Sequence, residues 1–274
     1  MHIPVLLNEI IDLIEPNKNY IDCTLSFGGH TKEILEKNKP NGKVLGIEID
    51  KEIFEKAISD DRLIAVNDSY INLEEIVKEN NFKEVSGILL DAGMSSYHVD
   101  LSERGFSFNK DEPLLMNYSD GISAEEIIND YNEEEIERIL REYGEEKFSR
   151  KIARKIVEER KKRRIKSTLQ LVEIIKRIVP RSKINPATRT FQALRIEANQ
   201  ELENLKKVLP QALKLLDSGG KLIIISFHSL EDRIVKNFIK DNQLELNKPI
   251  IPSEKEISLN PRSRSAKLRI IVKK

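Results

Sequence analysis

The chain has 274 residues, a length that suits one large domain or two of modest size. Apolar residues make up 39% and charged residues 34%, a balance typical of a globular protein that excludes collagen-like and low-complexity classes. Lys and Arg together number 46, as do Asp and Glu, so the net charge is zero. Taken alone, this neutrality argues against a nucleic-acid partner, because phosphate binding usually shows as a basic excess.

The cysteines and histidines favour neither disulfides nor metal binding. Cys23 stands alone, which excludes an internal disulfide and a cysteine-rich zinc site and favours a reducing compartment. No apolar run approaches the roughly 18 residues of a membrane span, and residues 1–7 lack the pattern of a signal peptide. We therefore expect a cytoplasmic protein without a metal. The histidines, none at metal-ligand spacing, are His2, His30, His98 and His228.

The first hundred residues alternate short apolar runs with helical patterns, which is typical of βαβ units. Four such units in succession predict an α/β fold with a doubly wound, mostly parallel sheet. The expected strands are residues 20–25, 44–49, 63–66 and 88–91, and the expected helices are residues 5–14, 31–37, 53–58 and 73–78.

After Asp100 the pattern becomes helical for about a hundred residues, which predicts an inserted helical domain. The α/β pattern then resumes. We expect one domain from residues 1–102 and 200–274, interrupted by a helical domain at 103–199. The inserted helices are expected at 133–143, 147–162 and 168–178, after a capping box at Ser123 to Glu126. In the part of the α/β domain that follows, we expect a helix at 200–216, a turn at 217–220, a strand at 222–227, a helix at 230–240 and a strand at 268–272.

The neutral total hides a strong separation of charge. Residues 101–146 contain 14 acidic and 4 basic residues, whereas residues 147–189 contain 16 basic and 3 acidic ones. Residues 160–166 are basic at six of seven positions, and the tail after Pro261 has basic residues only among its charged ones. A solvated helix face is the simpler explanation for one charge run, but two basic segments beside an α/β core favour a phosphate-rich partner.

The segment Ser26 to Thr31 places two glycines and a histidine between the first strand and its helix, where doubly wound folds bind ligands. Glu48 ends the second strand, 20 residues after Gly28, at the spacing of a carboxylate that accepts hydrogen bonds from ribose hydroxyls. Together they predict an adenosine-containing cofactor. The alternative is a tight turn formed by the glycines and a helix cap formed by Glu48.

Neither GxGxxG nor GxxxxGK[ST] is present, so a nicotinamide enzyme and a P-loop nucleotide site are disfavoured. S-adenosylmethionine has no phosphates to cradle, so a methyltransferase fits better. Asp91 ends the fourth strand, where a carboxylate could reach the cofactor or the reacting group, or only cap a helix. A hydrolase triad of His228, Ser229 and Asp232 is rejected, because no GxSxG elbow is present and Ser229 is better explained as a helix cap.

Long ordered motifs show that the chain resembles the MraW/RsmH family of S-adenosylmethionine-dependent methyltransferases, which methylate N4 of a cytosine in 16S ribosomal RNA. The likeness runs nearly end to end. Its motifs are HxPVLL at residues 2–7, GGH at 28–30, RGFSF at 104–108, YGEE at 143–146, NPATRTFQALRI at 185–196, FHSLEDR at 227–233 and NPRSRS at 260–265.

The resemblance implies a Rossmann-like class I methyltransferase domain whose helical insertion recognises the substrate, the 16S rRNA of the small ribosomal subunit. S-adenosyl-L-methionine is the implied cofactor, and Asp91 is the candidate acceptor of the amine proton. The implied cofactor contacts are Gly28, Gly29, His30, Glu48, Tyr70, Asp91 and His98. The residues expected to contact RNA are Arg104, Arg163, Arg164, Lys166, Arg189, Phe191, Arg195, Arg262 and Arg264.

Several positions depart from the family's usual residues. Glu48, Tyr70 and His98 stand where the family has Asp, Phe and Gln, and Ser26 stands where it has the first glycine of the loop. Residues 113–119 read PLLMNYS instead of PLDMRMD. These departures keep two alternatives open: a paralogue that methylates another RNA site, and a non-catalytic protein that binds the ribosome or assists its assembly.

Overall fold

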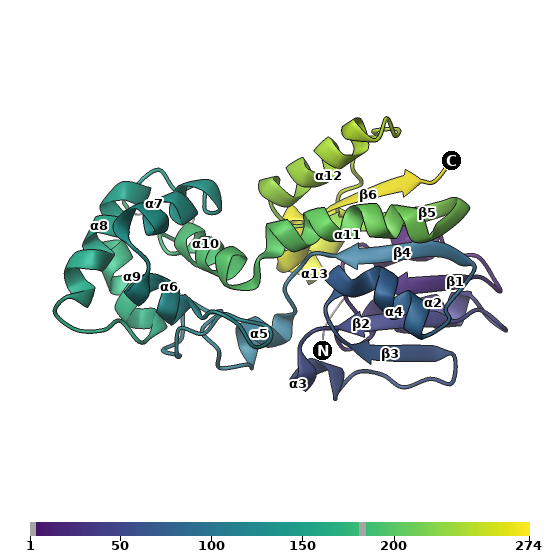
Figure 1. Ribbon diagram of the computed structural model, residues 1–274, viewed down its shortest axis with the longest axis horizontal. Coiled ribbons are helices and arrows are strands. Elements are labelled where there is room, and N and C mark those ends of the chain that lie inside the picture. Colours follow the sequence, from purple (N-terminus) through teal and green to yellow (C-terminus); the bar gives the residue numbers. More distant parts are fainter. Residues whose placement is uncertain (1–3, 181–184) are drawn as a thin grey trace. The chain divides into compact units, whose positions relative to one another are not determined.

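A computed structural model describes residues 4–180 and 185–274 (Figure 1). Its internal contacts divide the chain into two compact units. The sheet unit comprises Met1–Met94 and Leu202–Lys274, and the helical unit comprises Ser95–Glu201. The sequence predicts the corresponding boundaries between residues 102 and 103 and between residues 199 and 200. His2, which begins the first family motif, lies outside the described residues.

The sheet unit is built on six strands in the order β3-β2-β1-β4-β5-β6. The first five strands pair in parallel, and β6 pairs antiparallel with β5. This topology confirms the predicted doubly wound, mostly parallel α/β fold. The strands are β1 Asn19–Asp22, β2 Val44–Glu48, β3 Leu63–Asn67, β4 Val85–Asp91, β5 Leu216–Ser226 and β6 Lys267–Val272.

Successive strand side chains face two separate cores, one on each side of the sheet. Ile21 and Leu45 belong to the core that contains residues of α4, α11 and α12, whereas Tyr20 and Val44 belong to the core with α1 and α2. Helices therefore cover both faces, which explains why β2 is buried at every position and reads as a continuous apolar run. The helices of this part are α1 Leu7–Ile11, α2 Gly29–Lys37, α3 Lys51–Phe54, η1 Tyr70–Asn72, α4 Leu73–Glu79, α11 Glu201–Leu215, α12 Ser229–Asp241, α13 Glu254–Leu259 and η2 Pro261–Ser265.

Three local predictions are wrong. The expected turn at 217–220 lies within β5 as a shift in register, because Leu216 pairs with Val85 and Lys221 pairs with Gly87. The cap of α12 is His228 and not Ser229: the His228 Nδ1 accepts the backbone N–H of Glu231 at 3.4 Å. Residues 254–265, where the sequence predicts neither a helix nor a strand, form α13 and η2.

The helical unit packs short amphipathic helices around an isoleucine-rich core. Ser123 and Asn132 each form a capping box, so α6 and α7 begin where their side chains accept the first free backbone N–H groups. In the described ranges no helix combines the length and the apolar character that crossing a membrane requires. The helices are α5 Ser96–Asp100, α6 Ala124–Asp130, α7 Glu133–Glu142, α8 Ser149–Arg160, α9 Thr168–Lys176 and α10 Thr188–Asn199.

Candidate active site

The loop between β1 and α2 has a backbone conformation that requires glycine. Gly28 has a φ of 85°, and a Cβ there would lie 2.4 Å from Cγ1 of Ile58. Ser26 has a left-handed φ of 49°, so the serine at the family's first glycine keeps the backbone region that glycine favours. The backbone N–H of Gly28 donates to the carbonyl of Leu25 at 2.7 Å, which closes the turn. Glycine at position 28 thus lets the loop turn tightly against Ile58 at the carboxyl edge of the sheet.

We expect Gly28→Ala to lower the free energy of unfolding by about 1–3 kcal/mol, because it adds backbone strain and a clash with Ile58. Gly219→Ala is the matched control, since Gly219 also has a positive φ, 79°, but nothing lies within 4 Å of its Cβ position. Urea unfolding of both variants measures the difference. Equal losses would show that the contact with Ile58 costs nothing.

Glu48 connects this loop to the end of β2. Its Oε2 accepts the backbone N–H of Ser26 at 2.9 Å, and its Oε1 accepts that of Asp50 at 2.8 Å. Burial raises the pKa of Glu48 to about 7, although the two backbone N–H groups act to lower it. Asp50, and not Glu48, caps α3, by accepting from the backbone N–H groups that follow it. The structure therefore does not support a cap as the role of Glu48.

His30 and Asp91 lie together at the ends of β1 and β4. The Nδ1 of His30 is 3.9 Å from Oδ2 of Asp91, and the Nε2 of His30 is 3.0 Å from the carbonyl oxygen of Val5. Because a carbonyl only accepts, Nε2 carries a hydrogen and Nδ1 faces the carboxylate. Burial raises the pKa of Asp91, and His30 partly offsets that rise. The pair is a site where a proton can be taken up.

Asp22 supports this pair, and sequence reasoning missed it. Its Oδ2 accepts the hydroxyl of Thr31 at 2.7 Å, and its Oδ1 accepts the backbone N–H of Thr24 at 3.1 Å. The hydroxyl of Thr24 in turn accepts the backbone N–H of Asp91 at 2.9 Å. A chain of hydrogen bonds thus connects the ends of β1 and β4. The signal in the sequence was an acid inside an expected strand, four residues before the loop that begins at Ser26.

The other two implied cofactor contacts fall in different units. Tyr70 begins η1 directly after β3, so it lies at the same edge of the sheet as the ends of β1, β2 and β4. His98 lies in α5 of the helical unit. Its ring centroid is 4.7 Å from that of Tyr118 and 5.0 Å from that of Phe106. The sheet unit therefore contains six of the seven implied cofactor residues.

The segment that departs most from the family, residues 113–119, is held firmly within the helical unit. Tyr118 stacks on Phe106 with centroids 5.4 Å apart, and its hydroxyl donates to Glu201 at 3.0 Å. The backbone N–H of Tyr118 donates to Asn199 at 2.8 Å. The same Glu201 accepts two hydrogen bonds from Arg195, at 2.8 and 3.0 Å. Tyr118, where the family has a methionine, thus packs on an aromatic ring and joins a network that sequence reasoning did not find.

The residues expected to contact RNA occupy very different environments. Arg164 is held by Glu125 and Asp130, and Arg195 by Glu201. Arg104 donates to the carbonyls of residues 117 and 118. Phe191 is 5% exposed and packs edge to face on Phe108, as a core residue does. The remaining candidates are exposed or half-buried: Arg163, Lys166, Arg189, Arg262 and Arg264.

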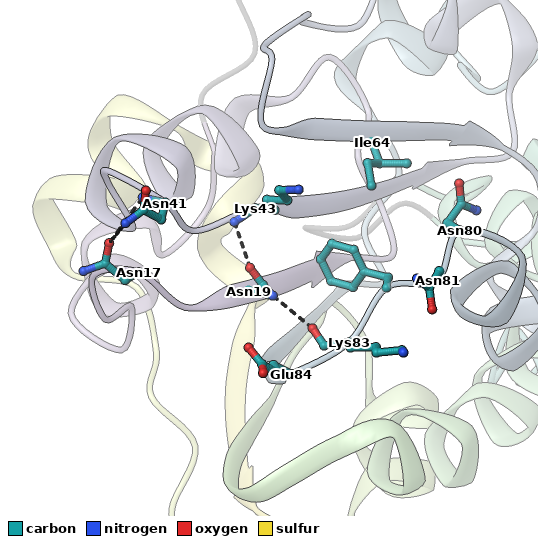
Figure 2. A pocket seen from close by; sticks show the side chains of 10 residues that line it. Asn17, Asn19, Asn41, Lys43, Ile64, Asn80, Asn81, Lys83 and Glu84 are labelled. Atoms are coloured by element: carbon teal, nitrogen blue, oxygen red, sulfur yellow. Dashed lines mark hydrogen bonds between the residues drawn. The ribbon is translucent and has the colours of Figure 1, made fainter.

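A polar hollow of about 500 Å³ lies at the opposite edge of the sheet, around the amino ends of the strands (Figure 2). Its asparagines make local structural bonds: Asn19 donates to the carbonyl of Lys83 and Asn41 donates to Asn17. Asn17 and Asn81 have φ values of 60° and 47°, typical of asparagine in turns. Because parallel sheets bind ligands at their carboxyl edge, this hollow is not the candidate site.

A model of the MraW methylase family matches residues 1–274. The ribosomal RNA small subunit methyltransferase H of Thermosipho melanesiensis is 46% identical over 284 residues, with 98% of this chain and 96% of the relative covered. The protein of that name from Clostridium botulinum strain Kyoto is 44% identical over 303 residues, covering 98% and 97%. The protein of that name from Fervidobacterium nodosum is 45% identical over 287 residues, covering 98% and 96%. These matches confirm the resemblance found in the motifs, and the chain belongs to the MraW methylase family.

Proposed function

We propose that this protein transfers a methyl group from S-adenosylmethionine to N4 of a cytosine in 16S rRNA of the small ribosomal subunit. Relatives at 44–46% identity are named ribosomal RNA small subunit methyltransferase H. The observation that carries the proposal is the grouping of a glycine loop, Glu48 and the His30–Asp91 pair at one edge of the sheet. The helical unit serves in this proposal as the part that recognises RNA.

The residues at this edge fit S-adenosylmethionine. Gly28 allows the loop its tight turn, and Glu48 offers a carboxylate to the ribose hydroxyls. Residues 22–31 contain no Lys or Arg, which suits a cofactor without phosphates. Gly29, His30, Tyr70 and Asp91 complete the proposed contacts in the sheet unit, and His98 is the proposed contact from the helical unit. When bound, S-adenosylmethionine supplies a methyl group on a positively charged sulfur.

Asp91 is the proposed acceptor of the proton that the cytosine amine must lose. The amine is a poor nucleophile because its lone pair is delocalised into the ring, so alignment and an acceptor contribute much of the rate. The Oδ1 of Asp91 is held by the backbone N–H of Gly93 at 3.1 Å, which leaves Oδ2 toward His30. His30 acts in this proposal as a positioning residue. The base must be single-stranded or flipped, because an amine inside a helix is out of reach.

The affinity for S-adenosylmethionine is expected to rise about tenfold between pH 6 and pH 8, because the ribose hydroxyls need the ionised form of Glu48. The pKa of about 7 means that this carboxylate ionises across that range. Calorimetry of the unaltered protein and of Glu48→Gln over this range isolates the contribution. We expect weaker binding by Glu48→Gln and a loss of the pH dependence. The same pH dependence in both proteins would contradict this role.

A transfer assay tests the proposed function. Purified protein is incubated with S-adenosylmethionine labelled in its methyl group and with small ribosomal subunits from a strain that lacks the gene. We expect label in 16S rRNA, and none with subunits from the parent strain, which are already methylated. Label in another RNA would support the alternative of a different site. No cofactor binding at millimolar concentration would support a non-catalytic ribosome-binding protein.

A further inference from the structure

Four of the eight cations from Arg154 to Lys166 have acidic partners. Lys155 lies 3.2 Å from Glu158 and 3.0 Å from Glu159, and Arg154 lies 3.7 Å from Glu158. Lys162 lies 3.0 Å from Glu159. Within the densest basic run, Arg164 is also held by two acids. These side chains cannot meet a phosphate without giving up an existing ion pair.

At the start of α8, three cations have no acidic partner in the described part of the chain. Lys147, Arg150 and Lys151 are all exposed, and among the described residues none of the three takes part in an ion pair or a side-chain hydrogen bond. Arg150 and Lys151 lie in the first turn of α8, and Lys147 lies in the turn that leads into it. The first turn of α8 contains no acidic residue. We name these three residues the α8 basic surface.

The α8 basic surface consists of unpaired charges on an anchored helix. Like charges repel, and the dipole of a helix disfavours cations in its first turn, so the free protein gains nothing from this arrangement. The helix beneath is anchored by Ser149, Ile152, Ala153 and Ile156, which are buried in the helical unit. The backbone that carries these charges is therefore held in place, while their long side chains are free to reach a partner with negative charges repeated along its length.

We infer that the α8 basic surface binds the phosphate backbone of the RNA substrate. This inference rests on the proposed function, which makes the substrate a polyanion. The inference also differs from the sequence-based expectation that Arg164 contacts RNA. The cations at 147–151 bind phosphates in preference to Arg164, because Arg164 must first give up its ion pairs with two acids. Each phosphate neutralised along single-stranded RNA releases counterions, so its contribution appears in the salt dependence of binding.

The test compares two triple variants of the full chain that remove the same charge from the same helix region. The first is Lys147→Gln/Arg150→Gln/Lys151→Gln. The matched control is Arg154→Gln/Lys155→Gln/Lys162→Gln, which removes cations already paired with acids. The probe is a radiolabelled transcript of small-subunit rRNA, bound on filters between about 50 and 200 mM salt.

We expect the first variant to reduce the slope of log affinity against log salt by about 2 and the control to change it by less than about 0.5. The melting temperature of the first variant should be unchanged or slightly raised, because the dipole no longer opposes cations. Equal slopes for the first variant and the unaltered protein would overturn the inference. The inference would also be overturned if the first variant bound assembled subunits more weakly but bound the transcript normally, because the partner of the surface would then be an acidic protein of the subunit.

The methyl-transfer assay separates this inference from the proposed function. If the unaltered protein labels 16S rRNA and the first variant keeps the full salt slope, only the inference fails. If the unaltered protein neither binds the transcript nor transfers methyl groups, the proposed function fails and the inference falls with it.

Discussion

Replacing Asp91 by asparagine is expected to lower the rate of methyl transfer at saturating S-adenosylmethionine by about 10²- to 10⁴-fold, the contribution typical of a positioned acid or base. Asparagine keeps the shape of the side chain and can still accept the hydrogen bond from Gly93. It cannot take up the proton that the amine releases. The measurement is kcat with small subunits, together with the Kd of S-adenosylmethionine from calorimetry.

The control for Asp91→Asn is Asp50→Asn, which changes another buried carboxylate of the sheet unit. Asp50 caps α3, and asparagine is an equally good cap, so we expect the rate to stay within about twofold. If Asp91→Asn weakens cofactor binding but keeps the full kcat at saturation, Asp91 holds the cofactor and is not the proton acceptor. A split between KM and kcat therefore decides between its two proposed roles.

The pH profile gives a second measure of the same role. Asp91 accepts a proton only when ionised, so the rate should fall as the pH is lowered, and its raised pKa moves this fall above the range of an ordinary aspartate. His30 lowers the pKa of Asp91, so His30→Gln should shift the acid limb to higher pH. An unshifted limb would contradict the coupling of the two residues.

Asp232→Ala is expected to lower the free energy of unfolding by about 3–5 kcal/mol, because it leaves a buried cation without its partner. Asp232 lies on α12, and its Oδ1 accepts from Nε of Arg269 on β6 at 2.6 Å. Lys267, also on β6, donates to Oδ2 at 3.2 Å. Asp232 and Arg269 are 4% and 8% exposed. The pair thus fastens the antiparallel edge strand to the helix, and urea unfolding measures its loss.

Two further variants test whether the loss comes from the unpaired buried charge. Lys236→Ala removes an exposed cation 3.9 Å from the same carboxylate and should cost less than about 1 kcal/mol. Asp232→Leu/Arg269→Met should be more stable than Asp232→Ala, because no charge is left buried and unpaired. A loss below about 1 kcal/mol for Asp232→Ala would contradict a structural role for this acid.

The pH dependence of stability follows from the same pair. Burial acts to raise the pKa of Asp232, but the hydrogen bonds from Arg269 and Lys267 outweigh it, so the pKa is lowered on folding. The stabilisation is therefore present above the pKa of the unfolded chain and is lost as the pH falls through the folded value. This loss should be absent in Asp232→Ala.

Strands buried on both faces could be predicted from the sequence because their runs are continuously apolar. Residues 222–227, for example, cannot have a wet face, and all of this stretch except its last residue lies in β5. The beginning of β5 could not be predicted, since Asp217 to Gly220 has the composition of a turn. The sheet accommodates these residues as a shift in register with Gly219 at a φ of 79°.

Side-chain partners distant in sequence were beyond prediction. Arg164 appeared as one cation in a basic run, but its partners Glu125 and Asp130 lie 39 and 34 positions earlier in the acidic stretch. The two oppositely charged segments partly neutralise each other in the folded helical unit. His228 could not be predicted as the cap of α12, because histidine is not a preferred N-cap residue. Its ring accepts the backbone N–H of Glu231, three residues later, and so takes the place of an ordinary cap.

The position of the methyl group on the product tests the central claim most directly. 16S rRNA from the parent strain, from a strain lacking the gene, and from that strain carrying either the unaltered chain or Asp91→Asn is digested to nucleosides and analysed by tandem mass spectrometry. We predict N4-methylcytidine at one position in the parent, its absence after deletion, and its return with the unaltered chain only. Digestion of the same RNA to oligonucleotides assigns the position, which digestion to nucleosides does not. N4-methylcytidine that persists after deletion, or a lost methyl group found on C5 or on the ribose, would contradict the account.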